Sequence, residues 1–141
     1  MSLPWVRLDS NIASHDKVLA ALGERGGKAT CAVYMFSLGW SGGHATDGHI
    51  PRAALPMLHG TPADAVTLER VGLWDPDPDG NGWWIHNYAQ RQETTDVTEV
   101  KREQAARAGR RSGCVRRGHP KGCTCWTDAP TVRLVEGGTN R

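Results

Sequence analysis

The residues best suited to chemistry in this 141-residue sequence form a short cysteine and histidine cluster. Its four members lie within twelve residues: Cys114, His119, Cys123 and Cys125. Zn²⁺ prefers four sulfur or nitrogen ligands in a tetrahedron, and a loop this short can surround one ion only where glycine permits tight turns. Gly118 and Gly122 occupy such positions. The spacing therefore predicts a structural Cys3His zinc site.

Other interpretations of this cluster stay open. Its three cysteines could remain thiols in an unordered segment, or Cys114 could form a disulfide with Cys123 or Cys125. A small zinc-dependent nuclease is disfavoured, because four protein ligands leave no open position for water. Cys31 stands alone in an apolar segment, and we expect it to be a small buried residue.

Histidines elsewhere in the sequence do not complete a catalytic group. His44, Asp47 and His49 stand in a glycine-containing segment that favours a turn, and His86 precedes Asn87 in a segment suited to a hairpin. No nucleophile, acid and base pair or phosphate-binding loop accompanies them. We therefore expect a protein that is not an enzyme.

Basic residues are concentrated just before and within the cluster. Between residues 101 and 121, only Glu103 opposes eight cations: Lys101, Arg102, Arg107, Arg110, Arg111, Arg116, Arg117 and Lys121. Residues 1–99 hold 7 Lys/Arg and 12 Asp/Glu, whereas residues 100–141 hold 10 and 3. This asymmetry predicts an arm that binds a polyanion, each cation being able to neutralise a phosphate. The alternative is a solvated helix in which Glu103 and Arg107 pair.

Hydrophobic spacing and turn residues predict the elements that position these groups. A short strand around Trp5–Leu8 precedes a helix with Ser14 as its N-cap, which ends at Gly26-Gly27. A buried helix then covers Lys28–Trp40, and we expect Ser41-Gly42-Gly43 to break it.

The next segment predicts two short helices and a hairpin. The expected elements are strand His49–Pro51, helix Arg52–Leu58, a helix from its N-cap Thr61 to Val71, and Leu73-Trp74 paired with Trp83–Ile85 across a turn segment at 75–82. The order of helix, turn, helix and hairpin is typical of a winged helix-turn-helix domain. The predicted fold class is therefore α+β.

A last helix is expected near Asp96, with Glu99 at the capping-box position, and extends to Arg110 or Arg111 without an apolar stripe. The predicted organisation is a winged-helix domain at 1–92, a basic helix at 93–112, a zinc-binding loop at 113–126 and a flexible tail at 127–141.

Three stretches of the sequence carry a family resemblance: WVRLDSNIASHDKVLAAL, TDGHIPRAALPMLHGTPADAVTLERVGLW and GWWIHNYAQRQ. In this order they resemble the N-terminal winged-helix domain of phage and prophage replication-initiator or replisome-organiser proteins, especially those of actinobacterial phages. The resemblance covers residues 5 to about 92. It implies DNA binding in a phage-derived context.

In a winged helix, the second helix of the turn enters the major groove. That geometry makes Thr61, Asp64, Thr67 and Arg70 candidates for base contact, with Arg52 as a further DNA contact. The alternative is that Val66, Leu68 and Val71 pack the core while the polar face serves a protein contact. The wing carries three carboxylates and no arginine, which argues against insertion of the wing into the minor groove: Asp75, Asp77 and Asp79.

Together these observations predict a phage-derived DNA-binding accessory or regulatory protein, acting in replication, recombination or transcription. Double-stranded DNA is the expected partner, bound through backbone phosphates by the basic arm and the winged helix. The second hypothesis is an adaptor whose winged helix docks a phage or host recombinase or replication enzyme. The sequence shows no secretory signal, no long apolar span and no disulfide framework, so we expect the cytoplasm of a bacterial host cell and no membrane contact.

Overall fold

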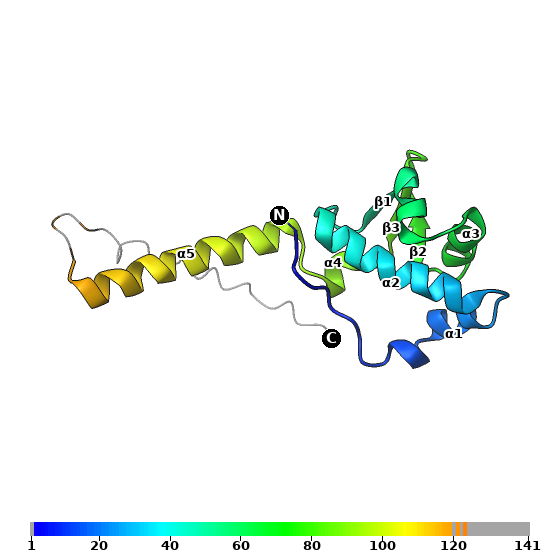
Figure 1. Ribbon diagram of the computed structural model, residues 1–141, viewed down its shortest axis with the longest axis horizontal. Coiled ribbons are helices and arrows are strands. Elements are labelled where there is room, and N and C mark those ends of the chain that lie inside the picture. The colour runs from blue at the N-terminus through cyan, green and yellow to red at the C-terminus, as the bar shows by residue number, and fades with distance from the viewer. Residues whose placement is uncertain (1, 120, 122, 124–141) are drawn as a thin grey trace, which may run out of the picture. The chain divides into compact units, whose positions relative to one another are not determined.

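The computed structural model describes residues 2–119, 121 and 123. The chain divides into two compact units, residues 1–96 and residues 97–141, called here the body and the arm. The body is an α+β unit, whereas the described part of the arm is dominated by one long helix (Figure 1). The helices within the described residues are all too short or too polar to cross a membrane.

The body contains four α-helices, two 3-10 helices and a small sheet. Its helices are η1 (Ile12–Ser14), α1 (Asp16–Leu22), α2 (Gly27–His44), η2 (Arg52–Leu58), α3 (Pro62–Arg70) and α4 (Tyr88–Arg91), and α5 (Thr95–Arg117) begins at its end. The strands are β1 (His49–Pro51), β2 (Trp74–Pro76) and β3 (Gly82–Ile85). They form an antiparallel sheet in the order β1-β3-β2. α2 contacts α1, α3, η2 and β1, so it is the central helix of the body.

Two tryptophans fix the sheet against α2. Trp74 of β2 is fully buried, and its indole N–H donates to the hydroxyl of Ser37 on α2 at 3.3 Å. The Trp83 ring on β3 lies 5.2 Å from the Trp74 ring, centroid to centroid. Around them pack Ile50 of β1 and Leu68 of α3, both fully buried. The predicted hairpin is thus confirmed, and it supplies the largest side chains of the core.

The hairpin extends further than predicted. Trp74 pairs with Ile85, and β2 continues through Asp75 to Pro76, which lies opposite Trp83. The sequence assigned Asp75 and Pro76 to the turn. Pro76 has no N–H to give to the ladder, but β2 is an edge strand of the order β1-β3-β2, where proline is tolerated.

The predicted opening strand is wrong. Trp5–Leu8 forms no regular element and pairs with no strand, and Trp5 is 63% exposed. Instead, the backbone N–H of Arg7 donates to Gln92 Oε1 at 2.8 Å, and Gln92 Nε2 donates to the Arg7 carbonyl at 2.7 Å. A buried side-chain amide therefore satisfies the backbone groups that a neighbouring strand would have satisfied.

The predicted break of α2 at Ser41-Gly42-Gly43 is also wrong, because the helix continues to His44. Its glycine at position 42 is needed for close packing: a Cβ there would lie 2.6 Å from Val6 Cγ1. The buried Ser41 hydroxyl accepts from the backbone N–H of Gly48 at 2.7 Å. Ala45, in the left-handed region at φ 54°, ends the helix.

The start of α1 differs from the prediction by one residue. Ser14 belongs to η1, and its hydroxyl donates to the Asn11 carbonyl at 3.2 Å. The N-cap is His15, whose Nδ1 accepts from the Lys17 backbone N–H at 3.3 Å. An imidazole nitrogen thus performs the capping that the sequence assigned to a hydroxyl.

The helix α5 is longer than predicted and has no buried residue. It begins at Thr95, whose backbone N–H and hydroxyl donate to the Asp47 carboxylate at 2.9 and 2.7 Å. The helix then runs past the predicted end at Arg110 or Arg111 to Arg117, so Cys114 lies on a helix rather than in a loop. The predicted tail at 127–141 lies outside the described residues.

Candidate metal centre and basic helix

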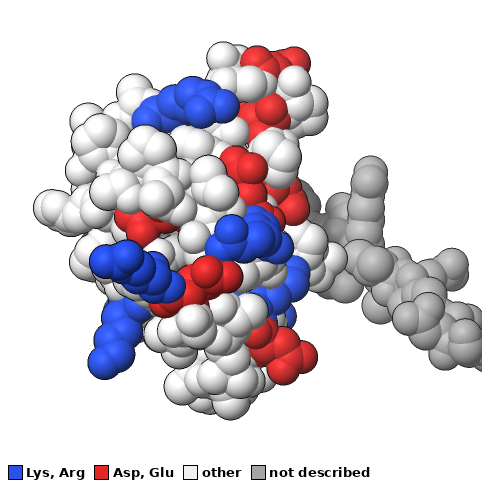
Figure 2. All heavy atoms as spheres, turned by 90° about the vertical axis from the view of Figure 1, so that its right-hand side faces the viewer, with Lys and Arg blue, Asp and Glu red and all other residues white. Residues whose placement is uncertain are grey.

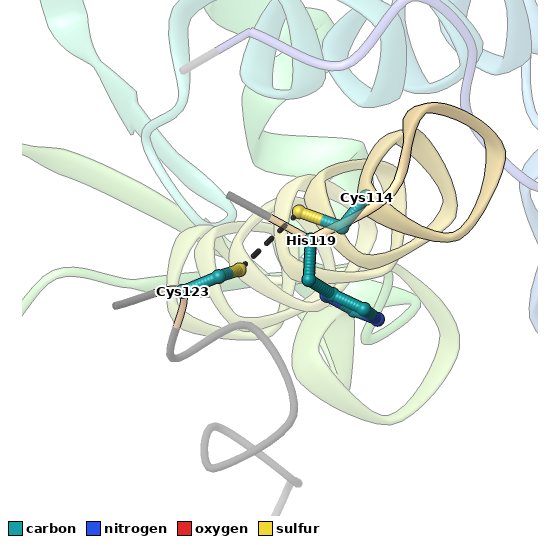
Figure 3. Close-up of side chains that lie close together, drawn as sticks. All are labelled: Cys114, His119 and Cys123. Atoms are coloured by element: carbon teal, nitrogen blue, oxygen red, sulfur yellow. Dashed lines mark hydrogen bonds between the residues drawn. The ribbon is translucent and has the colours of Figure 1, made fainter. Parts of the chain in front are cut away.

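The end of α5 brings part of the predicted zinc cluster together. Cys114 lies in the last turns of the helix, and Gly118 follows the helix in the left-handed region at φ +79°. Beyond this turn, His119 and Cys123 return to Cys114 (Figure 3). The figure shows the two sulfur atoms facing each other, with His119 beside them.

The spacing of these three side chains suits a metal ion. The sulfurs of Cys114 and Cys123 are 3.4 Å apart, and the ligand atoms of all three residues lie within 4.8 Å of one another. Zn–S bonds of about 2.3 Å in a tetrahedron separate neighbouring sulfurs by about 3.8 Å. The group could therefore hold a metal ion. The fourth predicted ligand, Cys125, and the predicted turn residue Gly122 lie outside the described residues.

Cys31 has a different environment. It lies on α2, half-buried against the hydrophobic core, with its sulfur 4.0 Å from the Val18 carbonyl oxygen. Burial raises the pKa of its thiol. This placement agrees with the predicted role as a small apolar residue, although burial is only partial.

The cations of α5 are exposed on all sides of the helix. Lys101, Arg102, Arg107, Arg110, Arg111, Arg116 and Arg117 are all exposed, as is Lys121 beyond the helix end. Successive residues of an α-helix are about 100° apart, so these positions surround the axis and do not form one stripe. Arg107 Nη2 lies 3.9 Å from Glu103 Oε2, at the i, i+4 spacing that the alternative interpretation predicted. Such an exposed pair is weak and leaves α5 strongly positive.

The predicted base-contacting residues of α3 are engaged within the body. Thr61 is the N-cap, and it forms a reciprocal capping box with Asp64. Asp64 also accepts from the Thr30 hydroxyl of α2 at 2.7 Å. Burial opposes ionisation of Asp64, but the hydrogen bonds from Thr30 and Thr61 hold its pKa below the usual value. The carboxylate therefore fastens α3 to α2.

Two of the remaining candidates, Arg70 on α3 and Arg52 on η2, also have partners. Arg70 forms a 2.9 Å ion pair with Glu24, and Thr67 is half-buried. Arg52 donates from Nε to the Gly80 carbonyl at 2.8 Å, and its guanidinium lies 5.2 Å from the centroid of the Trp83 ring. Arg52 thus stabilises the hairpin turn.

One packing expectation for α3 is corrected. Val66 was expected in the core beside Leu68, but it is 58% exposed, while Ala65 takes the buried position. On a helix, Ala65 and Leu68 share a face at i, i+3, and Val66 is turned away by about 100°.

Two of the three carboxylates of the hairpin, Asp75 and Asp77, are paired with histidines, which the sequence did not indicate. His86 Nδ1 lies 2.8 Å from Asp75, and His49 Nε2 lies 3.0 Å from Asp77. The Asp79 backbone N–H, acting with His49, lowers the pKa of Asp77 against the effect of desolvation. The strand register brings His49 opposite Trp84.

His44, Asp47 and His49 do not converge. His44 Nδ1 lies 2.8 Å from the Trp40 carbonyl, whereas Asp47 binds Thr95 and His49 pairs with Asp77. Asp47 lies in the predicted turn, whereas His44 is the last residue of α2 and His49 is the first residue of β1. Among the described residues, the Cys114, His119 and Cys123 group is the one metal-ligand cluster.

The visible face of the body carries mixed charge. Figure 2 shows lysine and arginine side chains interspersed with aspartate and glutamate on this face. No protein-family model, curated protein or solved structure matches the chain. The site's own charges and distances therefore carry its functional interpretation.

Proposed function

We propose that this protein binds double-stranded DNA through backbone phosphates, with α5 and Lys121 as the principal contact. The observation that carries the proposal is the exposed helix of seven cations, opposed within residues 101–117 only by Glu103. Electrostatic contact with phosphates does not require a base-reading surface, so it suits a helix charged on all sides. The role would be that of a phage-derived accessory or regulatory protein.

We also propose that the body is a winged-helix domain. The order α2, β1, η2, α3, β2 and β3, with β1 beside β3, supports this assignment. In such a domain α3 would face the major groove. The engagement of Thr61, Arg70 and Arg52 within the body means that DNA contact by these residues would compete with existing bonds. We therefore assign the body a secondary part in DNA affinity.

The proposed metal is structural Zn²⁺, held by a Cys3His set of Cys114, His119, Cys123 and Cys125. Soft sulfur donors close to an imidazole favour this metal. Bound zinc would fix the segment after Gly118 to the end of α5. Three thiolates on Zn²⁺ leave a net charge of −1, which Arg116, Arg117 and Lys121 would offset.

The test compares two full-length double variants with equal loss of charge. Arg110→Gln/Arg111→Gln removes two cations of α5, and Arg25→Gln/Lys28→Gln removes two exposed cations of the body. Binding to a random-sequence duplex is measured over a salt series. We expect the α5 variant to reduce the slope of log K against log salt by about 1.8, at about 0.9 for each lost phosphate contact. The body variant should keep the original slope, and an equal loss in both would contradict the proposal.

The second candidate is an adaptor whose body docks a replication or recombination enzyme. The exposed Val66 on α3 favours this function. Val66→Lys distinguishes the two. If α3 faces DNA, the added cation should raise DNA affinity, whereas an unchanged affinity would favour a protein partner for α3.

A further inference from the structure

The distance between the sulfurs of Cys114 and Cys123 is longer than a disulfide bond and shorter than the separation of two sulfurs bound to one zinc ion. Their 3.4 Å distance is near the edge of a zinc tetrahedron, about 3.8 Å. A disulfide requires about 2.05 Å, so an approach of about 1.4 Å would allow the bond to form. No other cysteine intervenes between the two in sequence, and Gly118 makes the turn that brings them together.

We propose that Cys114 and Cys123 are a redox-sensitive pair in which metal binding and disulfide formation exclude each other. This inference rests on the proposed metal site and does not require DNA binding. Both sulfurs are needed as ligands, and a disulfide removes both. The remaining members of the set, His119 and Cys125, would be too few for a structural zinc site, which needs four ligands.

The reaction balances with a peroxide as the oxidant. The two thiolates of Cys114 and Cys123 lose two electrons and form one S–S bond. The peroxide accepts these electrons with two protons, and its O–O bond breaks. Hydrogen peroxide yields two water molecules, and an alkyl peroxide yields one alcohol and one water. Zn²⁺ leaves with its charge unchanged. A dithiol reductant reverses the change by thiol–disulfide exchange.

Both cysteines are half-buried rather than enclosed, and His119 is exposed, so small oxidants and reductants have access to the pair. Cys31 differs in kind, because it stands on α2 against the core and burial raises the pKa of its thiol. The thiolate is the form that reacts, so Cys31 should be the slower cysteine. It therefore supplies a matched control within the same chain.

The experiment uses the full chain loaded with zinc and treated with hydrogen peroxide. Released zinc is followed with a chromogenic chelator, and disulfides are mapped by mass spectrometry after alkylation of the remaining thiols. We expect zinc release to track the Cys114–Cys123 linked peptide in equal amounts, and dithiothreitol with added zinc to restore the starting state. Cys31→Ser should behave like the wild type, whereas Cys123→Ser should lose the linked peptide.

Retention of zinc while the linked peptide forms would overturn the proposal, as would zinc release with Cys114 and Cys123 unlinked. A chain that takes up no zinc would also overturn it. Failure of DNA binding would leave these readouts unaffected. The redox inference and the proposed DNA contact can therefore fail independently.

Discussion

The body and the helix α5 use charged residues in opposite ways. In the body, several charged residues form ion pairs with one another: Arg70 pairs with Glu24, His49 with Asp77, and Arg91 with Asp9. On α5, by contrast, Arg107 makes only a long, exposed contact of 3.9 Å with Glu103. A charge that is already paired within a fold contributes little to the binding of a partner, whereas exposed charge without an excess of opposite charge nearby can attract an oppositely charged partner. Under the proposed function, the ion pairs of the body stabilise its structure and the cations of α5 provide affinity for DNA.

The largest expected effect comes from removing the side chain at the centre of the body's core. Trp74→Ala should lower the free energy of unfolding by roughly 3 to 5 kcal/mol, because it empties a fully buried site and leaves Ser37 without its donor. Urea unfolding followed by circular dichroism measures the loss. Trp5→Ala, at a site 63% exposed, is the control, and a comparable loss there would show that the core has been misplaced.

The next largest effect on the stability of the body is expected at two adjacent glycines of α2. A Cβ at Gly42 would meet Val6, whereas a Cβ at Gly43 has nothing within 4 Å. Gly42→Ala should therefore destabilise the body by about 1 to 3 kcal/mol. Gly43→Ala should stabilise it by up to about 1 kcal/mol through helix propensity. Thermal unfolding should shift in opposite directions, and shifts of the same sign would contradict the packing of Val6 on α2.

A pH series examines the capping carboxylate. The lowered pKa of Asp64 means that its stabilising effect is present above the usual carboxyl value of 3.8 and is lost as pH falls through the lower folded value. Asp64→Asn should cost about 1 kcal/mol at neutral pH, as for loss of a helix cap. It should also flatten the acid limb of the stability curve, and an unchanged acid limb would remove Asp64 from this role.

The smallest expected effect concerns an arginine in the body. Arg70→Gln should cost no more than about 0.5 kcal/mol, because its pair with Glu24 is exposed. If the comparison holds, the salt slope of DNA binding should stay the same. If Arg70→Gln reduced the salt slope by as much as the loss of one α5 arginine does, this result would instead indicate that α3 contacts the DNA phosphates.

The features predicted from sequence are those set by near neighbours. Thr61 and Pro62 predicted the start of α3 because capping is local, and the spacing of Cys114, His119 and Cys123 predicted their cluster because one turn joins them. Ser41-Gly42-Gly43 predicted a helix end because glycine is locally unfavourable. The packing of Val6 on Gly42 reverses that preference, and nothing near Gly42 in sequence reveals it.

Contacts between residues distant in sequence also explain several other differences from the predictions. Trp5–Leu8 has strand-like composition, but the partner of Arg7 is the Gln92 side chain, 85 residues away. Asp75 and Asp77 gave the hairpin an acidic composition, and only the tertiary structure pairs them with His86 and His49. Asp47 likewise binds Thr95 across a separation of 48 residues. Tertiary polar contacts therefore account for the partners of these residues that the sequence did not predict.

The two hydrogen bonds between Arg7 and Gln92 have a consequence for engineering and for evolution. They hold Arg7, near the start of the body, beside Gln92, near its end, and the Arg7 guanidinium reinforces this junction through Glu93 at 3.1 Å. A unit whose ends meet can be inserted into a loop of another protein, or rejoined and reopened elsewhere, with little strain on the host. The body is thus suited to act as a transferable cassette to which different C-terminal extensions can be attached.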